Sequence, residues 1–127
     1  MTTGTFIGVP EIYALDMAAK SVCDAFPESL GLYLVGSANE RADWRDIDLR
    51  LMLTDEDFAV LFPSADLRNG MYAHNPRWIL MVTAISERLC KATGLPVDFQ
   101  FQPMTDANAR HKGKRHPLGV RVEKANG

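Results

Sequence analysis

The segment DIDLRLML, residues 46–53, alternates strictly between polar and apolar side chains over its first six positions. Alternation with a period of two is typical of a β-strand that buries one face. It places Ile47 and Leu49 on the buried face, and Asp46, Asp48 and Arg50 on the opposite face. An ionised carboxylate needs water or a partner, because burying a lone charge is costly. The two aspartates therefore predict either a solvated strand face or a bound cation.

The rest of the chain is divided by residues that start and stop helices. Apolar positions at helical spacing predict three helices, and Thr54 and Asn75 are expected to cap the second and third. Proline or glycine follows each helix, as is typical of helix ends. The expected helices cover residues 10–26, 55–62 and 76–93. Residues 38–45 are expected to form a polar turn, and residues 64–74 a loop.

Two further apolar or alternating segments predict strands beside the first. They cover residues 31–37 and 95–102, and a small edge strand is expected at 118–122. This order predicts a two-layer α/β (α+β) fold, in which a small mixed β-sheet has helices packed on one face. We expect a single domain over residues 1–109, followed by a basic C-terminal tail over 110–127.

The charge distribution separates this tail from the body. Residues 1–109 hold 8 Lys+Arg and 15 Asp+Glu, a net charge of −7, whereas residues 110–127 hold 6 and 1, a net charge of +5. The segment RHKGKRH, residues 110–116, carries Arg110, Lys112, Lys114 and Arg115. These side chains suit nucleotide phosphates or an RNA backbone, or they form a solvated tail. Both interpretations remain open.

The apolar runs, the cysteines and the absence of common nucleotide-binding motifs bear on the cellular compartment and on the type of ligand. No apolar run approaches the roughly 20 residues of a membrane helix, and the first residues do not resemble a secretory signal. Cys23 and Cys90 lack metal-ligand spacing, so we interpret them as buried free thiols in the cytoplasm. No membrane partner is expected. The phosphate-binding loop and dinucleotide-binding motifs are also absent from the sequence.

A glycine turn and a third carboxylate complete a candidate site. Gly36 permits close approach of a ligand to the backbone, and Ser37 follows it at the end of a predicted strand. Asp98 lies on the polar face of the strand at 95–102. If the strands that carry Asp46, Asp48 and Asp98 are neighbours, three carboxylates converge. Mg²⁺ is commonly held by carboxylates together with substrate phosphates.

Gly36-Ser37, the spacer, Asp46-x-Asp48 and the later Asp98 resemble the DNA polymerase β-like nucleotidyltransferase superfamily, in particular its minimal members. The resemblance covers roughly residues 10–102, and the expected order of elements fits it. It implies that Gly36 and Ser37 hold the triphosphate of a nucleoside triphosphate. It also implies that Asp46 and Asp48 bind two Mg²⁺ ions, and that Asp98 binds one metal and acts as base toward an acceptor hydroxyl. A nucleoside monophosphate would be transferred, and pyrophosphate released.

Three arginines depart from the pattern that the resemblance implies. Arg41 lies four residues after Ser37, where many members carry an arginine closer to the turn. Arg45 replaces a common serine, and Arg50 replaces a common aliphatic residue. Arg41 and Arg45 are expected beside the nucleotide phosphates. Arg50 either neutralises a carboxylate, in competition with a metal, or binds a phosphate.

Two functions follow from this pattern. The first is a magnesium-dependent nucleotidyltransferase that acts on a hydroxyl of RNA, a protein or a small molecule. Because the chain is small, a partner protein, a homodimer or the acceptor macromolecule itself is expected to complete the enclosure of the substrates. The alternative is an inactive module of the same fold that binds a nucleotide, RNA or a protein. A pair of Arg50 with Asp46 or Asp48 would favour the binding module. An Arg50 that points away, with the three carboxylates converging within reach of a metal, would favour the enzyme.

Overall fold

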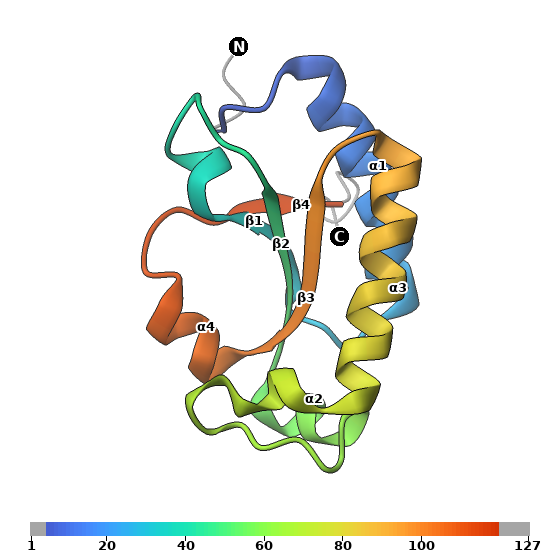
Figure 1. Ribbon diagram of the computed structural model, residues 1–127, viewed down its shortest axis with the longest axis vertical. Helices are drawn as coiled ribbons and strands as arrows, with labels where there is room; N and C mark the ends of the chain where they lie inside the picture. The colour runs from blue at the N-terminus through green and yellow to red at the C-terminus, as the bar shows by residue number, and fades with distance from the viewer. Residues whose placement is uncertain (1–4, 120–127) are drawn as a thin grey trace, which may run out of the picture.

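In the computed structural model of the chain, which describes residues 5–119, the helices and strands surround one small sheet (Figure 1). The helices are α1 (Val9–Ala25), α2 (Asp55–Leu61), α3 (Pro76–Thr93) and α4 (Met104–Arg110), with 3₁₀ helices η1 (Gly36–Asn39) and η2 (Arg68–His74). The strands are β1 (Gly31–Val35), β2 (Ile47–Leu53), β3 (Val97–Pro103) and β4 (His116–Leu118).

The sheet is mixed and has the strand order β3-β2-β1-β4. Strand β1 pairs antiparallel with β2 and β4, whereas β2 and β3 are parallel. Parallel neighbours require a crossover connection, and here α2, η2 and α3 supply it. The described residues therefore form a small mixed α/β domain, as the sequence pattern predicts.

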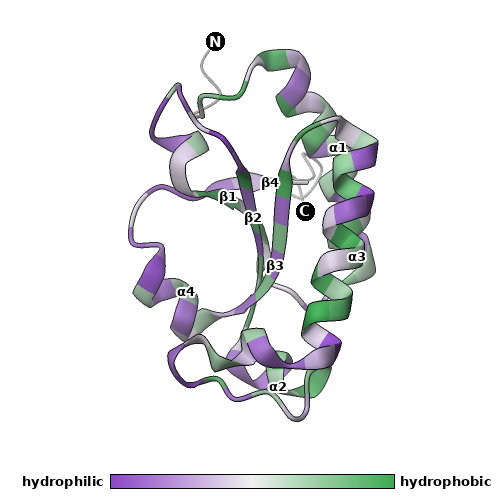
Figure 2. Ribbon diagram, viewed as in Figure 1, coloured by the Kyte–Doolittle hydropathy of each residue, from purple (hydrophilic) through white to green (hydrophobic). Residues whose placement is uncertain are grey.

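The apolar side chains of β2 lie on the helix-covered face of the sheet. Ile47, Leu49, Leu51 and Leu53 are completely buried, and α1 and α3 pack on their side (Figure 1). Figure 2 shows the matching alternation of apolar and polar residues along β2 and β3. The predicted period of two is thus confirmed, and it directs Asp48 and Arg50 toward the opposite face.

Hydrogen bonds and backbone angles confirm the predicted start of α2 and both predicted ends of α3. The Thr54 side chain accepts a hydrogen bond from Asp57 N at 3.1 Å, and Asn75 Oδ1 accepts one from Trp78 N at 3.0 Å. Gly94 ends α3 with a left-handed backbone at φ 73°. These local contacts satisfy N–H groups that have no partner within the helix.

The C-terminal third of the chain differs from the expectation. Residues 104–110, which show no clear periodicity, form α4 on the sheet face opposite α1 and α3 (Figure 1). The expectation that helices cover only one face is therefore wrong. Part of the expected basic tail belongs to the sheet, because β4 is the edge strand beside β1. It covers residues 116–118 rather than 118–122, and 120–122 lie outside the described residues.

Helix α4 is held by a polar network centred on Asp106. Asp106 accepts hydrogen bonds from Tyr72 Oη at 2.6 Å, Gln102 Nε2 at 3.0 Å and Arg110 Nε at 2.7 Å. Ala107 packs with Val35 and Met52 in a small second apolar cluster. These contacts join residues distant in sequence, which explains why the local sequence pattern did not predict the helix.

The outer edge of β3 is covered by side chains of α3. Ser86 Oγ accepts a hydrogen bond from Phe99 N at 2.9 Å, and Cys90 Sγ accepts one from Val97 N at 3.3 Å. Trp78 Nε1 donates to Phe101 O at 3.0 Å. The edge groups of β3 are thus satisfied by a helix rather than by another strand.

Two further expectations concern the cysteines and membranes. Cys23 and Cys90 are free thiols, and both are partly buried. Within residues 5–119, no helix combines the length and the apolar character that crossing a membrane would require.

Candidate functional site

Two of the three predicted aspartates lie side by side on the polar face of the sheet. Asp48 of β2 and Asp98 of β3 are partners in the parallel register. Neighbouring strands lie about 4.8 Å apart, and side chains in register point to the same face. Asp46 is exposed and directly precedes β2 rather than belonging to it. The strand pairing therefore brings Asp48 and Asp98 together, with Asp46 at their margin.

The Asp48 carboxylate lies against the glycine turn. Val35, the last residue of β1, is the register partner of Asp48, and Gly36 follows with φ 79°. A Cβ atom at Gly36 would lie only 2.6 Å from Asp48 Oδ2. A side chain at this position would thus be both strained and obstructed. Glycine lets the backbone of the turn approach the carboxylate.

Burial changes the protonation of Asp48. Desolvation is the main cause that raises the pKa of Asp48, and the negative charges of Asp98 and Asp46 add to it. The positive charge of Arg50 acts in the opposite direction. A raised pKa means that the charged form lacks sufficient stabilising partners. A cation bound beside Asp48 would stabilise the charged carboxylate, which the surrounding side chains do not stabilise sufficiently.

Asp98 has a different set of contacts. Arg50 Nη2 lies 3.6 Å from Asp98 Oδ2, and Arg50 Nη1 donates to the main-chain oxygen of Asp98 at 2.9 Å. The amide of Gln100 donates to both carboxylate oxygens at 3.4 Å. Arg50 is nearly buried, with 9% of its surface exposed. Among the three aspartates, the ion pair of Arg50 is therefore with Asp98.

The remaining predicted residues lie at the rim. Ser37 is partly exposed within η1, and its main-chain oxygen accepts from Glu40 N and Arg41 N. The Arg41 side chain is exposed and lies 3.5 Å from Asp43. Arg45 is exposed in the loop before β2. Beside Arg45, Trp44 packs against the core and donates to Phe6 O at 3.2 Å, so it has a structural role.

Two carboxylates of this face are available to the Mg²⁺ ion that the resemblance implies. Across residues 5–119, no three or more His, Cys, Asp or Glu side chains are grouped so that they could hold a metal ion. Mg²⁺ is often bound through one or two carboxylates, with water and substrate phosphates as the other ligands. Asp48 and Asp98, which share one face in register, fit that requirement as the protein's contribution.

A few buried polar atoms of the described residues have no hydrogen-bond partner. Within the described part of the chain, three buried side-chain atoms lack a hydrogen-bond partner, namely Asn39 Oδ1, Gln102 Oε1 and His111 Nε2. They belong to η1, to the polar face of β3, and to the end of α4. Buried unsatisfied atoms are uncommon in folded proteins and mark places where water or a ligand completes the network.

His111 was not predicted to belong to the site. Desolvation is the main cause that lowers its pKa, followed by the positive charges of Arg50 and Arg115. Arg115 Nε donates to His111 O at 3.0 Å, and Arg115 Nη1 contacts Met52 Sδ of β2 at 3.7 Å, so the segment after α4 lies against the polar face of β2. The motif RHKGKRH contains these residues, but their position depends on α4, which the local pattern did not reveal.

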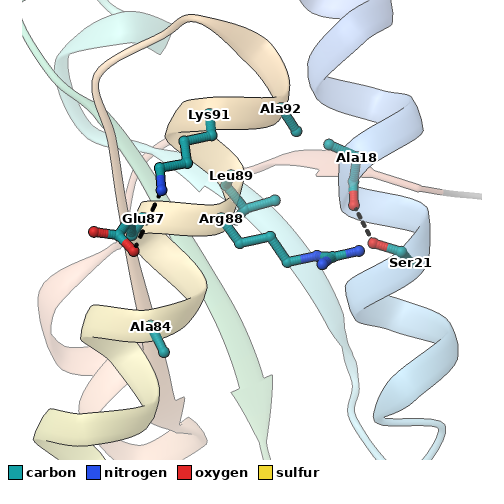
Figure 3. Close-up of a pocket in the computed structure, with 8 residues that line it drawn as sticks. All are labelled: Ala18, Ser21, Ala84, Glu87, Arg88, Leu89, Lys91 and Ala92. Carbon is teal, nitrogen blue, oxygen red and sulfur yellow. Dashed lines mark hydrogen bonds and ion pairs between the residues drawn. The ribbon is translucent and has the colours of Figure 1, made fainter.

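A hollow lies away from these residues, between α1 and α3 (Figure 3). It is an open groove of about 600 Å³ lined by small and charged side chains. Arg88 extends across it toward Ser21, and Lys91 lies 3.8 Å from Glu87. Because this groove is in the helix layer, the sheet separates it from Asp48 and Asp98.

In comparisons with known proteins, no protein family, curated protein or solved structure matches this chain.

Proposed function

We propose that the chain is a magnesium-dependent nucleotidyltransferase whose site is formed by Asp48, Asp98 and the Gly36-Ser37 turn. The observation that carries the proposal is the register of β1, β2 and β3. It puts two carboxylates on one face and a glycine turn against one of them. The resemblance of Gly-Ser and Asp-x-Asp to the polymerase β-like superfamily supports the same assignment.

The proposed reaction assigns a role to each part of this face. A hydroxyl oxygen of the acceptor forms a bond with the α-phosphorus of a nucleoside triphosphate. The bond from that phosphorus to the bridging oxygen breaks, and pyrophosphate leaves. Asp98 accepts the hydroxyl proton, while Gly36 and Ser37 hold the phosphates close to the backbone. Asp48 and Asp98 would hold Mg²⁺, which neutralises phosphate charge and orients the reacting oxygens when bound.

A titration of the purified chain with ATP, GTP, CTP and UTP tests the binding step, with and without magnesium. We expect magnesium-dependent binding of at least one triphosphate. Asp48→Asn should weaken it by at least about tenfold, because a ligand to the cation loses its charge. The control is Asp24→Asn, which removes the same charge from an exposed ion pair of α1, far from the site. This variant should bind the triphosphate like wild type. A folded wild-type chain that binds none of the four would overturn the proposal.

The transfer step has its own measurement. Triphosphates labelled at the α-phosphate are incubated with the chain alone, with RNA and with a protein mixture. Label on an acceptor, together with pyrophosphate release that Asp98→Asn abolishes, supports transfer. Magnesium-dependent binding without pyrophosphate release under any of these conditions contradicts it.

One observation favours a second candidate, a nucleotide-binding module that performs no transfer. Arg50 neutralises Asp98, which is the carboxylate assigned as base. Arg50→Gln separates the two functions. In a transferase, loss of a competing charge should raise the affinity for magnesium. In a binding module that uses Arg50 to hold phosphate, the same change should lower the affinity for the triphosphate.

A further inference from the structure

The groove between α1 and α3 is lined on both walls by small side chains. Ala18 lies on the α1 side, and Ala84 and Ala92 lie on the α3 side (Figure 3). A methyl group fills less of the space between two packed helices than a larger apolar side chain would. Leu89, which is 1% exposed, belongs to the core and also lines the groove. The groove therefore offers apolar surface, and its volume of about 600 Å³ is in the range of small-molecule sites.

Arg88 brings an unpaired positive charge into this groove. Its guanidinium extends across the hollow toward Ser21 (Figure 3), and it forms no hydrogen bond or ion pair with any of residues 5–119. Its acidic neighbour Glu87 lies 3.8 Å from Lys91 instead. The planar fork of N–H donors is thus available, and its geometry matches the two oxygens of a carboxylate.

Ser21 adds a polar group on the opposite wall. Its hydroxyl donates to Ala18 O at 2.8 Å, which leaves Oγ able to accept a hydrogen bond from a ligand. The groove thus combines apolar walls with a few polar groups that fix orientation, as is typical of sites for small molecules.

We propose that this groove binds a small organic carboxylate, with the carboxylate paired to Arg88 and an apolar body on Leu89 and the alanines. An inorganic anion would use Arg88 alone, and an ion pair at the surface contributes little without further burial. The proposal goes beyond the nucleotide site and does not depend on it, because the sheet lies between the groove and Asp48.

A titration of the isotope-labelled chain with hexanoate, followed by NMR of the backbone amides, tests the proposal. We expect saturable shifts at Ala18, Ser21 and Ala84, with a Kd of about 1 mM for a ligand of this size. Hexanamide has a similar shape without the charge, and inorganic phosphate has charge without an apolar body. Each should bind about tenfold more weakly than hexanoate.

Variants of α3 test the role of each wall. Arg88→Gln should weaken hexanoate binding about tenfold, and Arg88→Lys, which keeps the charge but not the fork, should have a smaller effect. Ala84→Leu should also weaken it, because the larger side chain fills the groove. Arg77→Gln is the matched control, since Arg77 is an exposed arginine of the same helix that does not line the groove. It should bind hexanoate like wild type.

Three results would overturn the proposal. The first is a folded wild-type chain that shows no saturable shift with about 10 mM hexanoate. The second is equal affinity for hexanoate and hexanamide, which would exclude recognition of the charge. The third is an equal loss of hexanoate binding in Arg88→Gln and Arg77→Gln, which would show a general effect of surface charge. Circular dichroism of each variant establishes that it is folded.

Discussion

At the scale of single residues, Gly36 has the most restricted position in the candidate site. Its φ of 79° disfavours a side chain, and its missing Cβ leaves room for Asp48 Oδ2. Gly94 has a similar φ of 73°, but a Cβ there would meet nothing within 4 Å. A side chain at Gly94 would therefore cause backbone strain alone, whereas one at Gly36 would cause backbone strain and also collide with Asp48.

We therefore expect Gly36→Ala to destabilise the fold more than Gly94→Ala. The second change costs about 1–2 kcal/mol of unfolding free energy through the left-handed backbone. The first adds about 1–3 kcal/mol because the methyl group displaces the Asp48 carboxylate. Urea denaturation measures both.

The double variant Gly36→Ala/Asp48→Ala is the critical comparison, because truncation of Asp48 removes the obstruction. Its cost should be smaller than the sum of the two single changes. Strict additivity would show that Gly36 and Asp48 do not interact.

At the scale of elements, the sequence predicts what local chemistry determines. The ends of α2 and α3 follow from Thr54, Asn75 and Gly94, which act on neighbours within a few residues. The alternation of β2 directly gives its buried face. Helix α4 was missed because Met104 and Ala107 provide too short an apolar stripe, and because its anchor, Tyr72, is 34 residues from Asp106. Long-range hydrogen bonds leave no periodic signal.

The Asp106 network gives a prediction about α4. Tyr72→Phe removes the 2.6 Å hydrogen bond to Asp106 and should cost about 1.5–3 kcal/mol at pH 7. Burial raises the pKa of Asp106, but hydrogen bonds from Tyr72, Gln102 and Arg110 outweigh it and lower the pKa overall. A lowered pKa stabilises the fold above the unfolded value of 3.8, and that stability is lost as pH falls through the folded pKa.

Acid unfolding of Tyr72→Phe should accordingly begin at a higher pH than that of wild type. Tyr33→Phe removes a more exposed hydroxyl, which donates to Leu30 O at 3.2 Å, and should cost about 0.5 kcal/mol. Equal losses in the two variants would contradict an anchoring role for Tyr72.

At the scale of the whole molecule, strand order determines which parts of the candidate site meet. The sequence predicts the three carboxylates and the glycine turn, but not the pairing that makes Asp98 the neighbour of Asp48. It also leaves open the partner of Arg50, because that contact depends on the parallel register of β2 and β3. Parallel pairing depends on the crossover through α3 and has no local signature.

Global stability should fall as the solution is acidified below about pH 6.5. Desolvation is the main cause that lowers the pKa of both His111 and His116 from 6.5. The unfolded chain then binds protons that the folded chain does not, and stability decreases until the folded pKa values are reached.

Denaturation at pH 7.0, 6.0 and 5.0 measures this loss, and His111→Gln should reduce its slope in that range. His74→Gln, at an exposed position, serves as the control and should keep the wild-type slope. A wild-type stability that is constant from pH 7 to pH 5 would contradict the prediction.

The covered edge of β3 has a consequence for assembly. Addition of a strand from a second molecule at this edge would first have to break the hydrogen bonds from Trp78, Ser86 and Cys90. The opposite edge, β4, has only three residues and includes Pro117, which has no N–H to donate. The sheet is thus protected at both sides from open-ended stacking into fibrils, and contacts with other chains must use helices or loops instead.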